Sequence, residues 1–254
     1  RAVPTLSSDS CEHHAAMGPE ETPVLILCGG RGTRLQHQGE SIPKALVEIG
    51  GMPIVWHVVQ CYLAAGFREI WLLTGYLGDQ IEKFVAEAQW LEGAQVECIE
   101  TGVDTPTGGR VAAVAERLAG RQFCLTYGDG VSDIDLAALL LEHQQGGLPV
   151  TVTAVQPELP FGVLDLDADL ITGFHEKPRA EQWINGGFLC AGPELLGELD
   201  SASVLEREPL EALAASGQLR AHRHNGFWAC MDTYKDTLML NDLYDRDEAP
   251  WRRW

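Results

Sequence analysis

Residues 27–35 read LCGGRGTRL, and this stretch decides the fold, because three glycines and two arginines directly follow the apolar run Val24–Leu27. Glycines at the end of such a strand usually let the backbone turn closely around a phosphate. The stretch is not the dinucleotide fingerprint G-x-G-x-x-G, since Leu35 stands where the third glycine belongs, and it lacks the Gly-Lys pair of a P-loop. It therefore predicts a phosphate-binding loop of neither common type.

Beyond this loop, apolar strands alternate with amphipathic helices. The pattern predicts strands at 70–74, 96–99 and 123–127, with helices at 53–65, 79–88, 111–118 and 134–144. Regular alternation with short connections favours an α/β fold, a Rossmann-like and mostly parallel sheet flanked by helices. Ligands of such sheets bind at the carboxyl ends of the strands, where the 27–35 loop and Gly128-Asp129-Gly130 both fall.

The second half of the chain has a different pattern. Short strands at 150–155, 163–166, 171–174 and 188–190, separated by turn residues, predict a small added mixed or antiparallel sheet. Helices at 194–199, 209–215 and 234–245 and a strand at 219–222 follow. Without an internal repeat or a low-complexity linker, we predict a single domain over residues 23–254, preceded by a flexible polar lead over residues 1–22.

The bulk composition limits the partners. A formal net charge of -19 argues against nucleic acid and against an anionic membrane surface, because both need basic protein surface. The longest apolar run, Leu136–Leu141, is too short to span a bilayer. Seven cysteines stand singly, without any C-x-x-C, which is typical of a reducing compartment. We therefore expect a cytoplasmic protein in which the few cations near glycines are informative.

Several charged residues occupy positions suited to phosphate chemistry. Arg34 can hold phosphate oxygens with its forked guanidinium, and Lys44 follows a polar stretch that predicts a loop. Asp129, between two glycines at a strand end, fits a Mg²⁺ ligand and fits a turn residue equally well. Asp232 is a second possible ligand, or else the N-cap of the helix that begins near Tyr234.

Two further segments suit a nucleotide sugar. Glu176-Lys177 and Asn185 combine an acid, a cation and an amide, which suits a polyhydroxy ligand that carries one phosphate. Thr107-Gly108-Gly109-Arg110 opens a helix, and a helix N-terminus after glycines can accept an anion or the flat edge of a base.

Taken together, the motifs resemble those of the sugar-1-phosphate nucleotidylyltransferases, and within them the glucose-1-phosphate cytidylyltransferases. The resemblance covers about residue 23 to the end of the chain, and six motifs occur in the family's order. They are Gly29-Gly30-Arg31-Gly32-Thr33-Arg34-Leu35, Pro43-Lys44, Gly128-Asp129, Glu176-Lys177-Pro178, Asn185-Gly186-Gly187 and Asp232. Strings typical of the cytidylyltransferases are Thr107-Gly-Gly-Arg110, Thr126-Tyr-Gly-Asp-Gly130 and Met231-Asp-Thr233.

The resemblance implies a nucleotide-diphospho-sugar transferase fold, a homo-oligomer and a specific reaction. An oxygen of a sugar 1-phosphate, α-D-glucose 1-phosphate above all, attacks the α-phosphate of CTP, which gives a CDP-sugar and pyrophosphate. It implies that Asp129 and Asp232 hold Mg²⁺, and that Arg34, Lys44, Asp129 and Lys177 are catalytic. Alternatives are the same reaction with UTP or dTTP, another sugar phosphate or a phosphonate as acceptor, and a non-catalytic subunit that senses nucleotide sugars.

The resemblance also implies two binding sets. Arg110 would donate to O2 or N3 of cytosine, which would favour CTP over UTP. The nucleotide set is Gly29, Gly30, Gly32, Thr33, Arg34, Thr107, Gly108, Gly109, Arg110, Tyr127 and Gly128. The sugar-phosphate set is Gly162, Glu176, Lys177 and Asn185.

Overall fold

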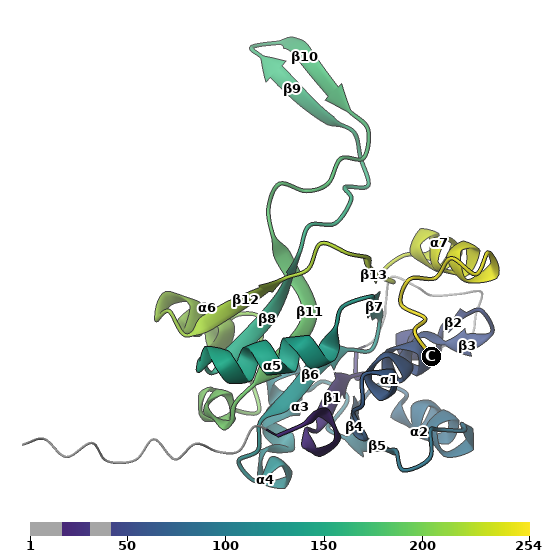
Figure 1. The fold of residues 1–254 in the computed structure, drawn as a ribbon, viewed down its shortest axis with the longest axis vertical. Helices are drawn as coiled ribbons and strands as arrows, with labels where there is room; N and C mark the ends of the chain where they lie inside the picture. Colours follow the sequence, from purple (N-terminus) through teal and green to yellow (C-terminus); the bar gives the residue numbers. More distant parts are fainter. Residues whose placement is uncertain (1–16, 31–41) are drawn as a thin grey trace, which may run out of the picture.

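The computed structural model describes residues 17–30 and 42–254, and its centre is a seven-stranded sheet of order β12-β8-β11-β6-β1-β4-β5 (Figure 1). The pairs β1–β4, β1–β6, β4–β5 and β8–β12 are parallel, whereas β11 runs antiparallel to β6 and β8. The predicted mostly parallel, mixed sheet is therefore confirmed. Its strands are β1 Val24–Leu27, β4 Glu69–Thr74, β5 Gln95–Glu100, β6 Phe123–Tyr127, β8 Val150–Val155, β11 Ile184–Ala191 and β12 Leu219–Arg223.

Helices cover both faces of this sheet, which explains why its strands are apolar without interruption. Successive side chains of a strand point to opposite faces, so Val24 and Ile26 enter one core cluster while Leu25 and Leu27 enter the other. The first cluster includes residues of α1 Ile54–Ala64, α2 Gly78–Glu87 and α5 Leu136–Gly146, and the second includes residues of α3 Thr107–Ala113, α4 Ala115–Leu118 and α6 Glu208–Ala215.

Three small features lie at the edge that carries the site. Strands β2 Glu48–Ile49 and β3 Met52–Pro53 form one short hairpin after the 3₁₀ turn η3 Lys44–Leu46. Strand β7 Gly130–Ser132 pairs with β13 Trp228–Cys230, which brings the end of β6 next to the start of α7 Tyr234–Asp245. Neither short pair was predicted, because two or three residues carry no measurable periodicity.

The second half differs from the prediction in where its strands go. Strands β8 and β11 join the central sheet instead of forming a separate one, and the added sheet is the hairpin of β9 Val163–Asp167 and β10 Leu170–His175. A predicted helix at 111–118 begins earlier, at Thr107, and divides into α3 and α4 at Val114. The predicted helix at 194–199 is the 3₁₀ helix η4 Pro193–Glu198.

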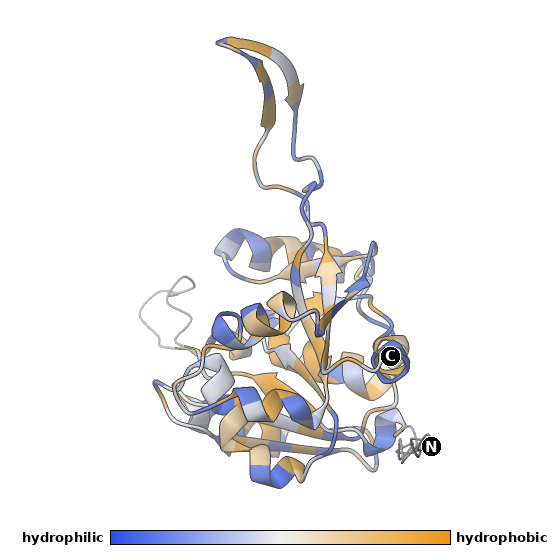
Figure 2. Ribbon diagram, turned by 90° about the vertical axis from the view of Figure 1, so that its left-hand side faces the viewer, coloured by the Kyte–Doolittle hydropathy of each residue, from blue (hydrophilic) through white to orange (hydrophobic). Residues whose placement is uncertain are grey.

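The hairpin of β9 and β10, here called the arm, projects far from the body of the molecule (Figures 1 and 2). Every residue of β9 is exposed, and so are five of the six residues of β10. Opposite residues of an antiparallel pair share a face, so Leu164 with Phe174 and Leu166 with Ile171 form one apolar face. The arm therefore exposes to solvent the kind of face that the body buries.

Of the predicted lead over residues 1–22, the structure describes residues 17–22. Residues 17–22 pack onto the body through the 3₁₀ helix η1 Pro19–Glu21; the Gln144 amide donates to the Met17 carbonyl at 2.7 Å, and Thr22 is fully buried. Residues 1–16 lie outside the described part. Within the described residues six cysteines are free thiols, and no helix is long and apolar enough to cross a membrane.

Candidate active site

At the start of the glycine-rich loop after β1, the space beside Gly29 is already occupied by another side chain. A Cβ at Gly29 would lie 2.0 Å from Cζ of Arg110, whereas a Cβ at Gly30 would meet no atom within 4 Å. Neither glycine has a positive φ, so the sequence needs glycine at position 29 for space and not for backbone conformation. The remainder of the loop, including predicted Gly32, Thr33 and Arg34, lies outside the described residues.

The Arg110 side chain fills that space and organises the surrounding loops. Its Nη1 donates to the Thr74 carbonyl at 2.8 Å, the Thr101 hydroxyl at 2.7 Å and the Gly102 carbonyl at 2.9 Å. Its Nη2 donates to the Gly29 carbonyl at 3.1 Å. Arg110 is 4% exposed, and its guanidinium donates to backbone oxygens and to one hydroxyl of the protein itself, whereas the sequence predicted a donor to a cytosine base.

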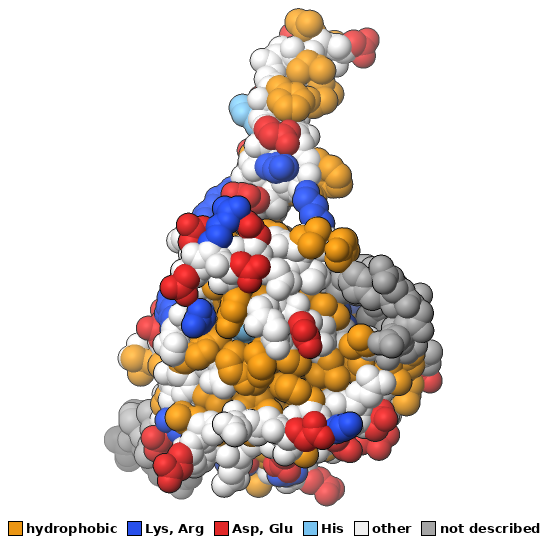
Figure 3. All heavy atoms as spheres, turned by 90° about the vertical axis from the view of Figure 1, so that its right-hand side faces the viewer, with side chains coloured by type: hydrophobic (Ala, Val, Ile, Leu, Met, Phe, Trp, Pro, Cys, Tyr) orange, Lys and Arg blue, Asp and Glu red, His pale blue; other side chains and the backbone are white. Residues whose placement is uncertain are grey.

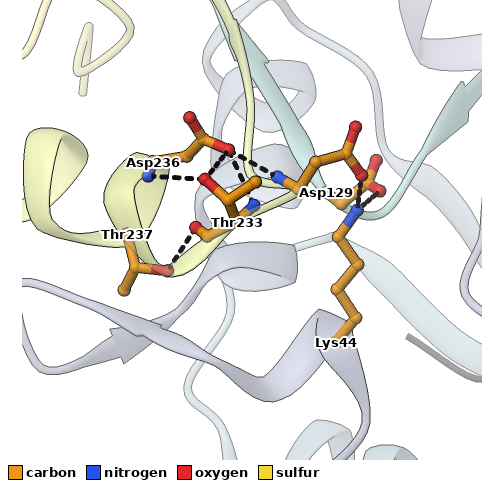
Figure 4. A network of polar contacts seen from close by, with 6 residues as sticks. Lys44, Asp129, Thr233, Asp236 and Thr237 are labelled. Atoms are coloured by element: carbon orange, nitrogen blue, oxygen red, sulfur yellow. Dashed lines mark hydrogen bonds and ion pairs between the residues drawn. The ribbon is translucent and has the colours of Figure 1, made fainter. Parts of the chain in front are cut away.

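A cation and two carboxylates meet at the carboxyl end of β6. The Lys44 ammonium, delivered by η3, lies 2.5 Å from Oδ2 of Asp129 and 2.6 Å from Oδ1 of Asp232 (Figure 4). Asp129 occupies the turn between β6 and β7, as the turn interpretation predicts, and its carboxylate contacts Lys44; its role as a Mg²⁺ ligand stays a prediction. Three segments far apart in the sequence thus converge on one point.

Electrostatics keep this lysine charged. Burial lowers the pKa of Lys44, but the negative charge of Asp129 and the hydrogen bonds to Asp129 and Asp232 outweigh it, so the net pKa shift is upward. In the folded state the Lys44 ammonium therefore stays protonated to a higher pH than an ordinary lysine. A permanent positive charge beside two carboxylates is suited to binding phosphate oxygens that enter between them.

The structure removes the alternative role of Asp232 as a helix N-cap. The N-cap of α7 is Thr233, whose hydroxyl accepts from the backbone N–H of Asp236 (Figure 4). The Asp236 carboxylate in return accepts from the backbone N–H groups of Thr233 at 2.7 Å and Asp232 at 3.1 Å. The capping box fixes the start of α7 and leaves the Asp232 side chain directed at Lys44.

The carboxylate pair fits a divalent cation by the chemistry of its donors. Within the described residues, ligand atoms of Asp129, Cys230 and Asp232 lie within 4.8 Å of one another, and no other group of three possible ligands does so. Both carboxylate oxygens already approach one cationic centre, the Lys44 ammonium. Two carboxylates plus substrate phosphates are the oxygen donors that Mg²⁺ takes in phosphoryl-transfer sites, whereas a thiol is a poor ligand for it.

Two cavities open on either side of this cluster. The larger, of about 690 Å³, contains Asn185 and Asp232 in its wall together with Glu206 and Trp228. The smaller, of about 240 Å³, is lined by Gly29, Gly30, Lys44, Thr107, Arg110 and Gly128, among others. Tyr127 and Asp129 line both cavities. Two ligands held in the two cavities would therefore approach each other at Asp129.

Several predicted residues lie elsewhere. A Cβ at Gly108 or Gly109 would collide with the carbonyl oxygen of Ser203 or Ser201, at 2.8 and 2.4 Å, so both glycines pack against that loop and not against a cavity. The predicted sugar-phosphate residues Gly162, Glu176 and Lys177 lie at the base of the arm, and only Lys177 lines a cavity, a third one of about 500 Å³. The structure thus does not bring these three to Asp129.

Two residues of the site were missed in the sequence. Cys230 precedes Asp232 by two positions on β13 and lines the larger cavity, and Glu206 lies in the loop before α6. Burial first, and the charge of Asp129 second, raise the pKa of Cys230 to about 12. Neither residue belongs to a recognisable motif; only the alternation along β13 could have placed Cys230 near Asp232.

The fold and site define the class of the protein, and comparisons with known proteins agree. The Nucleotidyl transferase family matches residues 23–227, and the chain belongs to this family. Its curated relatives include the glucose-1-phosphate cytidylyltransferases of Salmonella typhi and Salmonella typhimurium, each 37% identical over 254 residues, covering 91% of this chain and 99% of the relative. The solved structure of HddC from Yersinia pseudotuberculosis is 21% identical, with a TM-score of 0.69 over 88% of this chain and 99% of that one, which shows a shared fold.

Proposed function

We propose that this protein is a sugar-1-phosphate cytidylyltransferase that joins CTP and α-D-glucose 1-phosphate to give CDP-glucose and pyrophosphate. The observation that carries the proposal is the meeting of two cavities at Asp129, beside the Lys44 ammonium. A transferase that joins two phosphate-bearing substrates needs such an arrangement, since its catalysis is largely positioning and charge neutralisation. The identity shared with the two Salmonella enzymes supports CTP and glucose 1-phosphate as the particular pair.

The smaller cavity is the proposed nucleotide site, and the larger one is the proposed sugar-phosphate site. Gly29 and Gly30 present backbone to the smaller cavity, which suits a triphosphate. In the larger cavity the side-chain oxygen Oδ1 of Asn185 accepts from the backbone N–H of Gly187 at 2.8 Å, which fixes the orientation of the side-chain amide. An acid, an amide and an indole around 690 Å³ suit a hexose.

In the proposed reaction a phosphate oxygen of glucose 1-phosphate attacks the α-phosphorus of CTP, and the bond to the β-phosphate breaks. The electron pair leaves with pyrophosphate. Lys44 neutralises the charge that develops on the phosphate oxygens, and Arg34, assigned from the resemblance, would do the same at the leaving group. Asp129 and Asp232 would hold Mg²⁺, which would supply positive charge against the phosphate oxygens.

The role proposed for Arg110 changes in the light of its contacts. Since its amino groups donate to the carbonyls of three loops, we assign it the task of shaping the nucleotide cavity. Discrimination between cytosine and uracil then falls to the backbone around Gly29 and Thr107, whose groups face the same cavity. This proposal predicts that loss of Arg110 weakens the binding of every nucleoside triphosphate, and not of CTP alone.

A substrate panel tests the function. Purified protein is incubated with Mg²⁺, one of CTP, UTP, dTTP, ATP or GTP, and one of several sugar 1-phosphates, and released pyrophosphate is measured. We expect CTP with α-D-glucose 1-phosphate to give the highest kcat/KM, by about tenfold or more over UTP, the discrimination that one to two hydrogen bonds supply. Equal rates with CTP and UTP would overturn the cytidine assignment, and absence of turnover with every pair would favour a sensing subunit.

We also propose that the protein is a homo-oligomer assembled through the arm. The supporting observation is the apolar face of the arm, with Leu166, Ile171 and Phe174 each more than half exposed (Figure 3). An isolated two-stranded hairpin is at best marginally stable in water, so this face needs a covering surface.

A further inference from the structure

Glu206 lies between the two cavities and joins their walls. Its Oε2 accepts from the Thr107 hydroxyl at 2.6 Å, and its Oε1 accepts a short hydrogen bond from the Tyr127 hydroxyl. Thr107 belongs to the wall of the smaller cavity, Glu206 to that of the larger one, and Tyr127 to both. One carboxylate therefore fixes side chains from β6 and α3 that face different proposed substrates.

Further contacts lie on both sides of this carboxylate. The Thr107 hydroxyl accepts from the backbone N–H of Leu205 at 2.9 Å, which ties it to the same loop as Glu206. On the other side, Tyr127 and Asn185 line the larger cavity together. The hydrogen bonds thus run from Tyr127, which lines both cavities, through Glu206 to Thr107, in the proposed nucleotide site.

The Tyr127 ring has little freedom apart from this contact. Gly187 has a φ of +79°, and a Cβ there would lie 2.8 Å from Cδ2 of the ring, so the backbone of β11 passes directly against its face. Burial first, and then the charge of Glu206, raise the pKa of Tyr127, so its hydroxyl keeps its proton and donates to the carboxylate. Glu206 sets the direction of this hydroxyl, since ring position alone leaves the O–H free to rotate.

We propose that Glu206 is a positioning residue that holds Tyr127 and Thr107 in place and so determines the affinity of both cavities for their substrates. The proposal rests on the proposed function for the identity of those substrates. It assigns Glu206 no contact with a reacting atom. Removing the carboxylate leaves two hydroxyls without their acceptor, and hydrogen bonds to a charged group contribute enough for about a tenfold effect or more.

The test compares Glu206→Ala with Glu206→Gln and with Glu208→Ala, a matched control two residues later whose side chain is exposed at the start of α6. We expect Glu206→Ala to raise the KM for CTP and the KM for glucose 1-phosphate by about tenfold each, with a smaller change in kcat. Glu206→Gln should recover part of both, because its amide oxygen still accepts from one hydroxyl. Glu208→Ala should match the wild type in both constants.

A double-mutant cycle separates positioning from general destabilisation. Tyr127→Phe should raise both KM values in the wild type. It should add little in the Glu206→Ala background, where the partner of that hydroxyl is gone, and less than in the wild type in the Glu206→Gln background, where the partner is weakened. Additive effects would overturn the proposal, as would KM values at the wild-type level in Glu206→Ala. Should the alanine variant fail to fold, as judged by circular dichroism, the cycle with Glu206→Gln decides.

The two proposals fail in different ways. If the wild type prefers a donor other than CTP, the cytidine assignment fails. The Glu206 proposal is then tested by measuring the KM values of the variants with that preferred donor. Calorimetric titration with CTP and Mg²⁺ gives a second measure, in which Glu206→Ala should bind about tenfold more weakly than Glu208→Ala. Equal binding by these two variants overturns the Glu206 proposal, and a wild type that neither binds nor converts any panel substrate overturns both.

Discussion

The central sheet and the arm both contain strands with apolar side chains, yet only the sheet buries those side chains. Strand β1 is buried at all four positions because helices cover both of its faces, whereas β9 is exposed at all five. The difference extends to function: the candidate site residues carried by the body, Lys44, Asp129 and Asp232, converge, and those near the arm, Glu176 and Lys177, do not. The alternation of residues along a strand thus predicts which face of the sheet a side chain lies on. Whether that face is buried or exposed depends on tertiary packing.

The largest expected effect lies in the body of the molecule. Asp129→Asn removes one charge of the carboxylate pair while keeping its shape, and we expect kcat to fall by about 10²–10³-fold, the range for loss of one preorganised electrostatic group. Asp245→Asn, an exposed carboxylate at the end of α7, is the matched control and should be neutral. Steady-state pyrophosphate release measures both variants, and unchanged turnover in Asp129→Asn would refute the proposed metal site.

The next prediction concerns the arm. Charges placed on its apolar face, as in the double variant Leu166→Asp and Ile171→Asp, should convert the oligomer to a monomer, because burying unpaired charges is costly. Light scattering coupled to size exclusion gives the mass directly. Leu141→Asp, which charges an exposed leucine on α5, should leave the mass unchanged. A wild type that is already monomeric, or a double variant that keeps its mass, contradicts assembly through the arm.

A smaller effect should separate two neighbouring glycines of the phosphate loop. Gly29→Ala places a methyl group 2.0 Å from the Arg110 guanidinium, and overpacking of this kind costs about 1–3 kcal/mol. Gly30→Ala meets open space and should leave the free energy of unfolding unchanged, while still obstructing a triphosphate. Urea denaturation without ligand and CTP titration distinguish the two variants. Equal unfolding midpoints for the Gly29→Ala and Gly30→Ala variants would contradict the prediction that the Arg110 side chain needs the space left by glycine at position 29.

The last and smallest prediction is that Cys230 reacts slowly with alkylating reagents. Burial and Asp129 raise its pKa to about 12, so the thiol is neutral at pH 8 and the reactive thiolate fraction is about 10⁻⁴. Because the pKa is raised, the alkylation rate should climb about tenfold per pH unit between pH 7 and pH 10. Mass spectrometry after iodoacetamide treatment measures it at this peptide, and a plateau below pH 9 would contradict the raised pKa.

The sequence was sufficient for the features that depend on local pattern. Strand β1 and the turn that carries Asp129 follow from apolar runs that end in glycines, and the mostly parallel sheet follows from the alternation of strands and helices. Lys44 and Asp232 were candidates from their local sequence, and the family resemblance implied their roles. Their convergence with Asp129 was implied by that resemblance and is seen in the distances of 2.5 and 2.6 Å.

The features that the sequence did not reveal depend on contacts between distant segments. Glu206 stands in a charged run that is typical of a helix start, and its partners Thr107 and Tyr127 are 99 and 79 positions away. Arg110 looked like a free donor because its acceptors are backbone carbonyls, which carry no sequence signal. The arm was predicted as strands, but alternation along β9 cannot show whether anything covers its apolar face.

The most direct test of the central claim is a crystal structure of the protein with a non-reactive CTP analogue, glucose 1-phosphate and Mn²⁺, located by its anomalous signal. We predict Mn²⁺ bound to Asp129 and Asp232, the nucleotide in the cavity lined by Gly29 and Gly30, and the sugar in the cavity lined by Asn185. A nucleotide in the larger cavity, or Mn²⁺ bound away from both carboxylates, would contradict the account.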